Sequence, residues 1–372
     1  MNATIEAGLV AGIDPHKRTL TVTILDERGG VLGTESFNVS GAGHRAMLAW
    51  AADIGRIRVW GVEGASGLGR HTAVFLARAQ ADVREVCPTR TAEQARRRRQ
   101  GKTDNLDAER IAREVQAHPD LPAAFKRASG DIGPDPVHDQ MALLHKARRS
   151  LLKTRQHVMN EAEAILIALP EHLQGALGRD DDVRHRLKRL ASLDRAGIDD
   201  PVVRLRLELV DQAAADITNL DARDKTITSR LRQLVDTQDS TLDDLCGIST
   251  KSAVELLVET GDPRRFTESG FARFNGTAPI PASSGEGAGE PVRHRLDQGG
   301  NRQVNAVLHR MAVTQLRCHP PARELYERAR SRGHTKREAM RILKRHLSNA
   351  VYRTMLRDTL RSGHAEELRE AA

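Results

Sequence analysis

The chain has 372 residues, enough for two or three domains, and its 58 Lys and Arg against 50 Asp and Glu give a formal net charge of +8. Hydrophobic residues make up 39% and aromatic residues only 3%, which favours helices and small α/β units over a large β-sandwich. The basic balance indicates a polyanionic partner, most simply nucleic acid.

The cysteines and the N-terminus argue against several other classes of protein. Cys87, Cys246 and Cys318 are widely separated and form no CxxC, so reduced thiols are expected rather than a zinc knuckle or a disulfide framework. The first residues lack the charged segment and apolar run of a signal peptide, and no stretch approaches the roughly 18 apolar residues of a membrane span. We therefore expect a cytoplasmic protein that has no membrane partner and, as a DNA-binding protein, associates with the nucleoid.

Residues 8–120 are predicted to form an α/β domain. Apolar and alternating runs predict strands 8–14, 19–27 and 31–39, helix 43–55, strand 56–64, helix 67–81, strand 82–88, an arginine-rich helix and a helix from Asp104. Three strands that can form a meander, followed by alternating helices and strands, are typical of an RNase H-like domain.

Four acidic residues stand at the ends of these elements. Asp14 closes the first strand, Glu63 closes the fourth, and Asp104 and Asp107 open the last helix. In a sheet with this strand order the first and fourth strands are neighbours, so their carboxyl ends converge and a helix start can approach the same point. Each acid alone also fits a structural role as a helix cap, a turn residue or a loop residue.

Together, the four carboxylates predict a Mg²⁺ site. Like charges at close range raise one another's pKa unless a cation neutralises them, and Mg²⁺ prefers oxygen ligands. Two such ions about 3.5–4 Å apart can flank a scissile phosphate and stabilise its attacking and leaving oxygens. The basic run before the acidic helix is expected to bind the nucleic acid that the acids alone would repel: Arg96, Arg97, Arg98, Arg99 and Lys102.

The middle of the chain differs from the first domain in composition and periodicity. Residues 121–136 are rich in Pro, Gly and Ala and are predicted to be a linker. Residues 137–238 are predicted to form a coiled coil, because eight of the ten a and d positions from Val203 to Leu234 are apolar. Two long helices that fold back as a hairpin, and helices that pair with another subunit, fit this pattern equally well.

Residues 240–362 are predicted to form a compact helical domain. Residues 242–262 predict a helix, a turn with Gly247 and a second helix, which fits either a phosphate-holding helix-hairpin-helix or an ordinary helical hairpin. Ser283 and Ser284 follow in a loop rich in Gly and Pro. This loop is either a flexible connection or the site of a serine that attacks DNA phosphate to form a covalent phosphoserine link.

Two features around the serines favour the nucleophile. Gly285 permits close approach of the backbone to a ligand, and basic residues downstream could stabilise a pentacovalent phosphate: Arg293, His294, Arg295 and Arg302. The GxSxG motif does not surround these serines, which argues against a hydrolase with a Ser-His-Asp triad.

Seven segments follow one another over nearly the whole chain: VAGIDPHKRTLTVTILDERG, WGVEGASGLG, RRRRQGKTDNLDAERIAR, LCGISTKSAVELLVETGDPRRF, PIPASSG, GGNRQVNAVLH and TKREAMRILKRHL. In this order they resemble the bridge-RNA-guided insertion-sequence transposases of the DEDD type, the IS one-ten family. The GKTDNLDAE element is the specific one, and PASSG is specific in combination with it.

The resemblance implies a RuvC-like domain, a coiled-coil middle and a C-terminal transposase domain. It implies that the DEDD acids, which fall on Asp14, Glu63, Asp104 and Asp107, bind Mg²⁺, and that Ser284, with Ser283 as the alternative, is the nucleophile. It further implies homodimers and homotetramers in which the acids of one subunit meet the serine of another, and a noncoding guide RNA that pairs with donor and target DNA. The chain departs from many members at 297–298, where Asp and Gln stand in place of a Lys before the Gly-Asn pair.

The expected function is therefore that of an RNA-guided, Mg²⁺-dependent DNA transposase or recombinase that cleaves and rejoins DNA through a phosphoserine intermediate. The alternative is a RuvC-like nuclease of the junction-resolvase type, which uses metal-activated water and forms no covalent intermediate. A third hypothesis is a protein that only binds nucleic acid, and the presence of all four acids and the serine argues against it.

Overall fold

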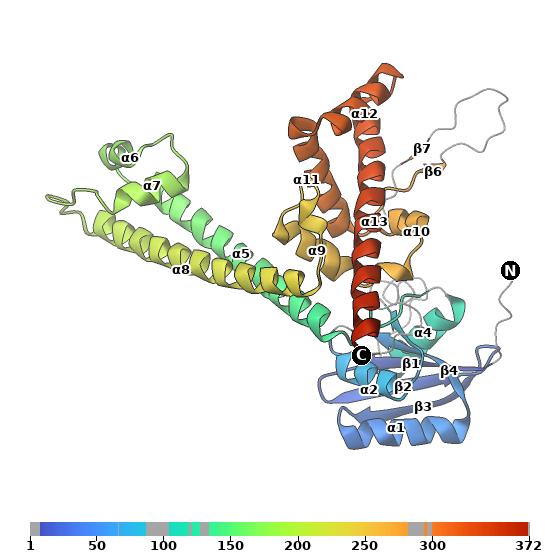
Figure 1. Cartoon of the computed structure of the whole chain (residues 1–372). Coiled ribbons are helices and arrows are strands. Elements are labelled where there is room, and N and C mark those ends of the chain that lie inside the picture. The colour runs from blue at the N-terminus through green and yellow to red at the C-terminus, as the bar shows by residue number, and fades with distance from the viewer. Residues whose placement is uncertain are drawn as a thin grey trace. The chain divides into compact units, whose positions relative to one another are not determined.

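The computed structural model describes residues 8–65, 67–86, 104–118, 121–126, 134–281, 294–295 and 300–370 (Figure 1). Its contacts divide the chain into two compact units. The N-terminal unit comprises Met1–Pro136 with Gly261–Thr267, and the helical unit comprises Val137–Thr260 with Glu268–Ala372. The four-part division predicted from the sequence stays a prediction.

A five-stranded sheet forms the centre of the N-terminal unit. Its strands lie in the order β3-β2-β1-β4-β5 and span Leu9–Pro15 (β1), Thr19–Leu25 (β2), Val31–Asn38 (β3), Ile57–Glu63 (β4) and Val83–Val86 (β5). β2 pairs antiparallel with both β1 and β3, whereas β4 pairs parallel with β1 and β5. The prediction that the first and fourth strands are neighbours is confirmed.

Helices cover both faces of this sheet (Figure 1). On one face, α1 (Gly41–Ile54) and α2 (Arg70–Arg78) bury Met47, Ala73 and Leu76 against alternate strand residues such as Ile13 and Val62. On the other face, α4 (Asp104–Ala117) packs Ile111 and Val115 against Val10, Val59 and Val86. Because side chains alternate between the faces of a strand, residues 10, 12 and 14 of β1 face α4 while residues 11 and 13 face the other layer.

The segment after α4 extends the edge of the sheet. Glu85 N donates to Pro122 O at 2.8 Å, and Ala124 N donates to Val83 O at 2.8 Å, so residues 122–124 run beside β5. The chain returns to this unit at 261–267, where Asp262 N donates to Lys126 O at 2.8 Å and the short 3-10 helix η2 (Pro263–Arg265) follows.

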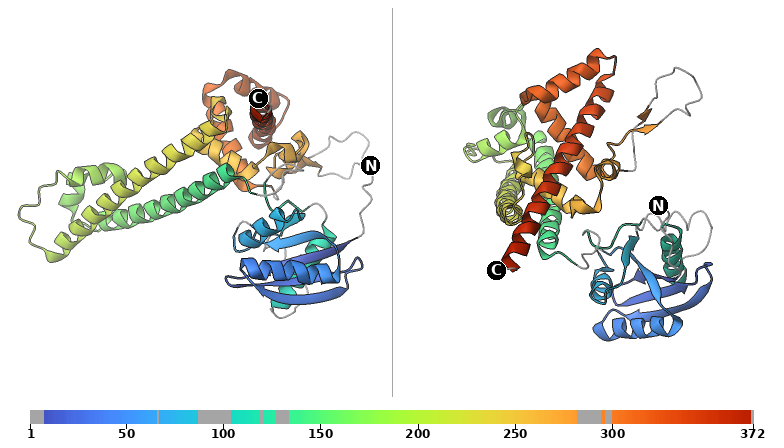
Figure 2. Two further views of the ribbon diagram at one scale, coloured as in Figure 1. Left: turned by 60° about the horizontal axis from the view of Figure 1, so that its bottom comes forward. Right: turned by 45° about the vertical axis from the view of Figure 1, so that its right-hand side comes forward.

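Two long helices of the helical unit, α5 (Pro136–Ile167) and α8 (Pro201–Thr237), fold back on each other as a hairpin (Figure 2). Ion pairs join them along their length: Arg148 to Asp224 at 2.7 Å and Arg155 to Asp221 at 2.5 Å. Of the two arrangements that the sequence left open, the chain adopts the intramolecular hairpin. The coiled-coil assignment itself stays a prediction.

Two short helices, α6 (Glu171–Leu177) and α7 (Val183–Leu190), close the tip of the hairpin. Leu173, Leu177 and Leu190 form one cluster with Leu166 of α5 and Val203 of α8. Arg186 is buried and donates from Nη2 to the carbonyl oxygen of Leu166 at 3.1 Å. The tip therefore has a core of its own, which fixes the turn between the two long helices.

The remaining helices pack at the base of the hairpin: α9 (Thr250–Thr260), α10 (Glu268–Phe274), α11 (Arg302–Cys318), α12 (Pro320–Ser331) and α13 (Lys336–Glu370). The helix that the sequence predicts before Gly247 is only one 3-10 turn, η1 (Leu242–Asp244). Its start is held by Asp358, whose carboxylate accepts from Thr241 N at 2.7 Å. In the part of the chain that the structure describes, none of the helices is apolar and long enough to cross a membrane.

Candidate active site

Asp14 and Glu63 end two neighbouring strands at the same edge of the sheet. The last registered pair of β1 and β4 is Ile13 with Val62, so the next residue of each strand is an acid. Gly12 and Gly61 face α4, and each acid stands two residues after one of these glycines. Because alternate residues of a strand share a face, both acids lie on the face that α4 covers. Asp14 is buried, at 6% exposure, and Glu63 is half-buried.

The direction of α4 brings its first turn to the same edge. A Cβ on Gly12 would lie 2.2 Å from Ala112 N and 2.4 Å from Ala108 O, so the helix backbone rests directly on β1 at this glycine. Gln116, near the end of the helix, donates from Nε2 to the carbonyl oxygen of Asp26 at 2.9 Å, and Asp26 follows Leu25, the residue registered with Val10 near the start of β1. The helix therefore runs opposite to β1, and its start points toward the end of the strand where Asp14 lies.

Two of the acids have basic partners. Arg110 is buried and pairs with Asp107 across one helical turn, with Nη1 2.5 Å from Oδ1. His16 Nε2 lies 3.4 Å from Asp14 Oδ2, an ion pair when the imidazole is protonated. The Arg110 guanidinium thus neutralises part of the negative charge at this edge and fixes the orientation of Asp107.

The acids fit a divalent cation in chemistry, although the described side chains do not complete a site. All the candidate ligands are carboxylates, the donors that hard divalent cations prefer. Asp104 begins α4, but its side chain lies outside the described residues. Among the residues that are described, no three His, Cys, Asp or Glu side chains are grouped so that they could hold a metal ion.

The predicted nucleophile and most of the predicted nucleic-acid contacts lie outside the described residues: Ser283, Ser284, Arg96, Arg97, Arg98, Arg99, Lys102 and Arg293. The strands on either side of the serine segment are described. β6 (Ile280–Pro281) pairs antiparallel with β7 (His294–Arg295), and Pro281 is registered with His294. The two ends of the segment that contains the serines are therefore held next to each other.

Gly300 and Asn301 have a clear structural role. A Cβ on Gly300 would lie 2.3 Å from Gly276 N, so only glycine lets these two backbone segments meet. Asn301 caps α11 by accepting from Gln303 N and Val304 N at 3.0 Å each, and its Nδ2 donates to Glu259 at 2.8 Å. Arg302, which follows, is exposed on the first turn of α11.

Sequence reasoning missed the residues that orient the acids. Arg110 and His16 had no assigned role, yet each contacts one of the predicted ligands. The spacing of Asp107 and Arg110, three residues apart in a predicted helix, was the available signal for the first pair. For the second pair, His16 follows Asp14 by two residues, directly after the end of β1 at Pro15, and this spacing carries no comparable rule.

Comparison with known proteins supplies the family. Residues 11–169 match the DEDD transposase model of the IS110 type, described as Transposase, and residues 239–327 match the model described as Transposase IS116/IS110/IS902 family. The two matches occur in chain order and together cover more than half of the chain. The chain belongs to the IS110 family of transposases.

One relative of this chain is "Insertion element IS110 uncharacterized 43.6 kDa protein" of Streptomyces coelicolor, which is 29% identical to it over 154 residues. The match covers 40% of this chain and 37% of that protein, little more than a third of the relative's length. The DEDD type of the first model suggests a divalent metal. Asp14, Glu63, Asp104 and Asp107 all fall within the range of that model.

Proposed function

We propose that this IS110-family chain is a DNA transposase that cleaves and rejoins the DNA of an insertion element at a site containing Mg²⁺. The observation that supports it most directly is the gathering of acids at one edge of the sheet. Asp14 and Glu63 end parallel neighbouring strands, and the helix that begins with Asp104 and contains Asp107 points its start toward them. We assign all four acids as the metal ligands of an RNase H-like, RuvC-type domain.

In this proposal the chain's own groups set the geometry of the acids. The ends of two paired strands hold Asp14 and Glu63 rigidly, and Arg110 holds Asp107. His16, with Nε2 3.4 Å from Asp14 Oδ2, contacts that carboxylate from the end of the same strand. Divalent cations bound here would supply positive charge at the scissile phosphate, which the carboxylates alone would repel.

Ser284 is the proposed nucleophile. Its Oγ loses its proton and forms a bond to phosphorus while one P–O bond of the phosphodiester breaks and a DNA hydroxyl leaves. Attack by a hydroxyl of another strand end reverses the step and releases the serine. Each step exchanges one phosphate ester for another, so the strands can be rejoined without hydrolysis. Arg293, Arg295 and Arg302, near the serine in sequence, would stabilise the charge of the pentacovalent phosphate.

The proposed partners are donor DNA, target DNA and a noncoding guide RNA that pairs with both. The basic run Arg96 to Arg99 with Lys102 would contact their phosphates. We further propose that the chain acts as a homodimer or homotetramer in which the serine of one subunit meets the acids of another, with the coiled-coil hairpin as part of the assembly.

Trapping the covalent intermediate tests this function. The chain is purified with its RNA and incubated with end-labelled donor DNA and Mg²⁺, and labelled protein is sought on a denaturing gel. We expect an adduct from the wild type and from Ser283→Ala, and none from Ser284→Ala. Ser283→Ala is the matched control, because it removes the neighbouring hydroxyl from the same segment.

The other outcomes identify the alternatives. Full DNA cleavage by Ser284→Ala, without any adduct, would mean a nuclease that uses water. An adduct that forms only when Ser283 is intact would transfer the role to that residue. DNA binding without strand breakage on any substrate, with or without Mg²⁺, would mean a protein that only binds nucleic acid.

A further inference from the structure

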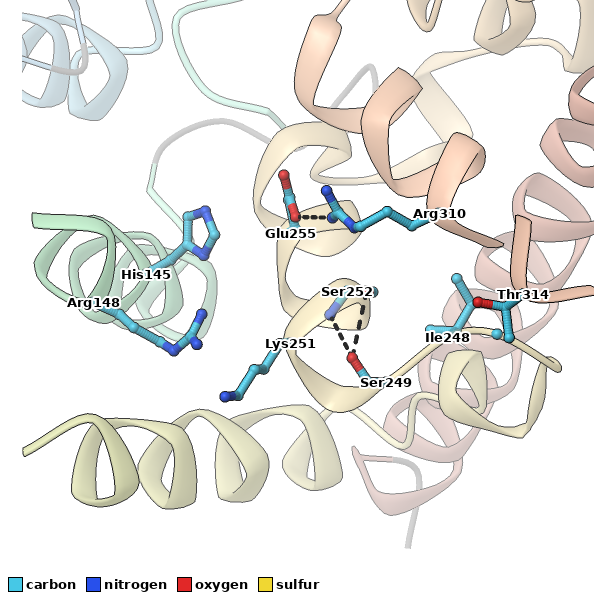
Figure 3. Close-up of a pocket in the computed structure, with 10 residues that line it drawn as sticks. His145, Arg148, Ile248, Ser249, Lys251, Ser252, Glu255, Arg310 and Thr314 are labelled. Carbon is cyan, nitrogen blue, oxygen red and sulfur yellow. Dashed lines mark hydrogen bonds and ion pairs between the residues drawn. The ribbon is translucent and has the colours of Figure 1, made fainter. Parts of the chain in front are cut away.

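The helical unit contains a pocket of about 630 Å³ where α5, α9 and α11 meet (Figure 3). His145 and Arg148 of α5 extend their side chains toward α9, and Lys251 and Glu255 of α9 and Arg310 of α11 contribute the rest of its charged lining. The volume lies within the range of roughly 300–1,000 Å³ found for sites that bind small molecules, so a nucleotide fits. None of the residues predicted for the catalytic, metal or nucleic-acid site lines this pocket, but Gly247 does, in the turn for which the sequence left a phosphate-holding helix-hairpin-helix open.

The lining carries excess positive charge. Arg310 pairs with Glu255 at 2.6 Å, while Arg148 and Lys251 share Asp224 of α8 at 2.7 and 3.5 Å. Three cationic side chains, those of Arg148, Lys251 and Arg310, are therefore paired with only two carboxylates. The Lys251 side chain is 48% exposed. Its contact with Asp224 is long, so its ammonium group can turn toward a ligand in the pocket.

The N-terminus of α9 also faces the pocket. Gly247, Ser249 and Ser252 line it, and α9 begins at Thr250. The first amides of a helix have no acceptor within the helix and carry partial positive charge, which favours an anion. Ser249 Oγ accepts from Ser252 N only at 3.4 Å, so the cap is a weak one. Gly247 adopts φ +88° in the turn, a conformation that favours glycine, and so brings the turn into place.

His145 supplies an independent indication of a ligand. Its side chain is only 7% exposed, lines the pocket, and has a buried Nε2 without a hydrogen-bond partner in the part of the chain that the structure describes. A buried polar atom without a partner costs about 1–3 kcal/mol, so such atoms normally find one. Because Nε2 is itself closed to solvent, a ligand in the pocket would satisfy it after a small rotation of the ring.

We propose that this pocket binds a backbone phosphate of the nucleic acid on which the protein acts, with His145, Lys251 and the first amides of α9 as its contacts. The inference rests on the proposed function, which supplies the nucleic acid. A phosphodiester matches the pocket because it is a compact anion with several acceptor oxygens, as helix N-termini bind it in other proteins. Both DNA and RNA present this group, and the test distinguishes them.

The test measures binding of the full chain, freed of RNA, to a labelled 30-base-pair DNA duplex and to a single-stranded RNA of 30 nucleotides, over a range of salt concentrations. Lys251→Gln is expected to weaken binding about 3- to 10-fold and to reduce the slope of log affinity against log salt by about one. His145→Leu is expected to weaken it about 5-fold. Lys188→Gln, which removes the same charge from an exposed position on α7, is the matched control and should leave the salt slope unchanged.

The outcomes separate this inference from the function on which it rests. If the wild type binds neither probe, the proposed function fails. If the wild type binds and both pocket variants bind as Lys188→Gln does, the pocket is not a phosphate site while the proposed function stands. A loss confined to the DNA or to the RNA probe supports the site and names the strand that occupies it. Since Lys251 is exposed, its substitution tests the pocket even if His145→Leu does not fold.

Discussion

The core of the N-terminal unit and the pocket of the helical unit each contain a buried histidine, but the hydrogen bonding of the two Nε2 atoms differs. His44, 5% exposed, has its Nε2 3.0 Å from Thr72 Oγ1 and its ring stacked on Phe75 with centroids 5.0 Å apart. His145, 7% exposed, has no described partner for its Nε2 and lies beside Arg148 and Lys251. The first histidine is hydrogen-bonded within a core, whereas the second has a ring nitrogen that the proposed phosphate would contact.

The comparison extends to the charges of the two regions. In the candidate active site of the N-terminal unit, Asp14 and Glu63 lie at one edge of the sheet, and we propose that a cation binds there. The pocket of the helical unit gathers cations around a helix N-terminus, where an anion is needed. A phosphodiester together with a divalent metal would balance the negative charge of the first region. A phosphodiester alone would balance the positive charge of the second. The four predictions below test whether each region has the role that its charged side chains indicate.

The largest effect on DNA cleavage is expected at the acidic edge, the edge of the sheet where Asp14 and Glu63 lie. Asp14→Asn keeps the size of the side chain and removes its charge, so we expect DNA cleavage to slow by about 100- to 1,000-fold, while DNA binding and thermal stability change little. The matched control is Asp53→Asn, on the exposed surface of α1. Cleavage of labelled donor DNA, measured with Mg²⁺ and after its removal by a chelator, is the readout. Wild-type cleavage by Asp14→Asn would mean that the edge is not the catalytic region.

The second prediction concerns the contact that brings α4 to that edge. Gly12→Ala places a Cβ 2.2 Å from the backbone of Ala112, so either the helix or the strand must move. We expect a loss of about 2–3 kcal/mol in the free energy of unfolding of the N-terminal unit. Both tryptophans of the chain, Trp50 and Trp60, lie in this unit, so their fluorescence during urea unfolding reports on it alone.

Gly41→Ala is the control for this substitution. Its added Cβ would meet only the flexible end of Arg45, at 3.4 Å, so its effect should stay within about 0.5 kcal/mol. Equal stability of Gly12→Ala and Gly41→Ala would show that α4 does not rest on β1, and the convergence of the acids would then lose its basis.

The acidic edge was predictable from sequence because its determinants are local. A short apolar strand that ends in Asp14, a second one that ends in Glu63, and a polar start to a periodic helix are each visible in a few residues. The strand order then follows from the sequence of elements, and neighbours in that order share an edge. The positions of Arg110 and His16 needed the structure, because side-chain direction depends on packing.

The sequence offered a phosphate-holding turn at Gly247 as one alternative, but it did not show the pocket around that turn, because the lining residues come from three helices far apart in the chain. Nothing near His145 in sequence shows that its Nε2 is buried without a partner, and Arg310 lies 55 residues from its partner Glu255. The same limit applies to Cys246 and Cys318, which appear unrelated in sequence but have their Sγ atoms 3.5 Å apart. The choice between an intramolecular hairpin and pairing with another subunit was also undecided until Arg155 was seen to pair with Asp221.

The third prediction compares the two histidines directly. His44→Leu leaves the buried Thr72 hydroxyl without its partner and should lower the free energy of unfolding of the N-terminal unit by about 1–3 kcal/mol. His145→Leu removes a polar atom that had no partner, so the helical unit should be unchanged or slightly more stable. Tryptophan fluorescence follows the first unfolding, and tyrosine fluorescence follows the second, since Tyr326 and Tyr352 both lie in the helical unit. Equal destabilisation by both substitutions would mean that His145 has a structural partner and is not reserved for a ligand.

The smallest effect is a pH dependence that belongs to His145. Burial lowers the pKa of this histidine below its usual 6.5, and the neighbouring Arg149 and Arg148 of α5 act in the same direction, against Glu255 and Glu259 of α9. The unfolded chain therefore binds a proton more readily than the folded chain does. Above pH 6.5 the histidine is neutral in both states and the helical unit has its full stability, and this stability is lost as the pH falls below 6.5 toward the folded pKa.

The difference between wild type and His145→Leu isolates this contribution from that of the other titrating groups. We expect the wild type to lose more stability than the variant between pH 7.5 and 5.5, measured by the melting of the helical unit in chloride. Inorganic phosphate should reduce the difference, because an anion in the pocket favours the protonated imidazole and raises its pKa. If phosphate shifts wild type and variant equally at every pH, then it does not bind beside His145, and the contrast with His44 would reflect packing alone.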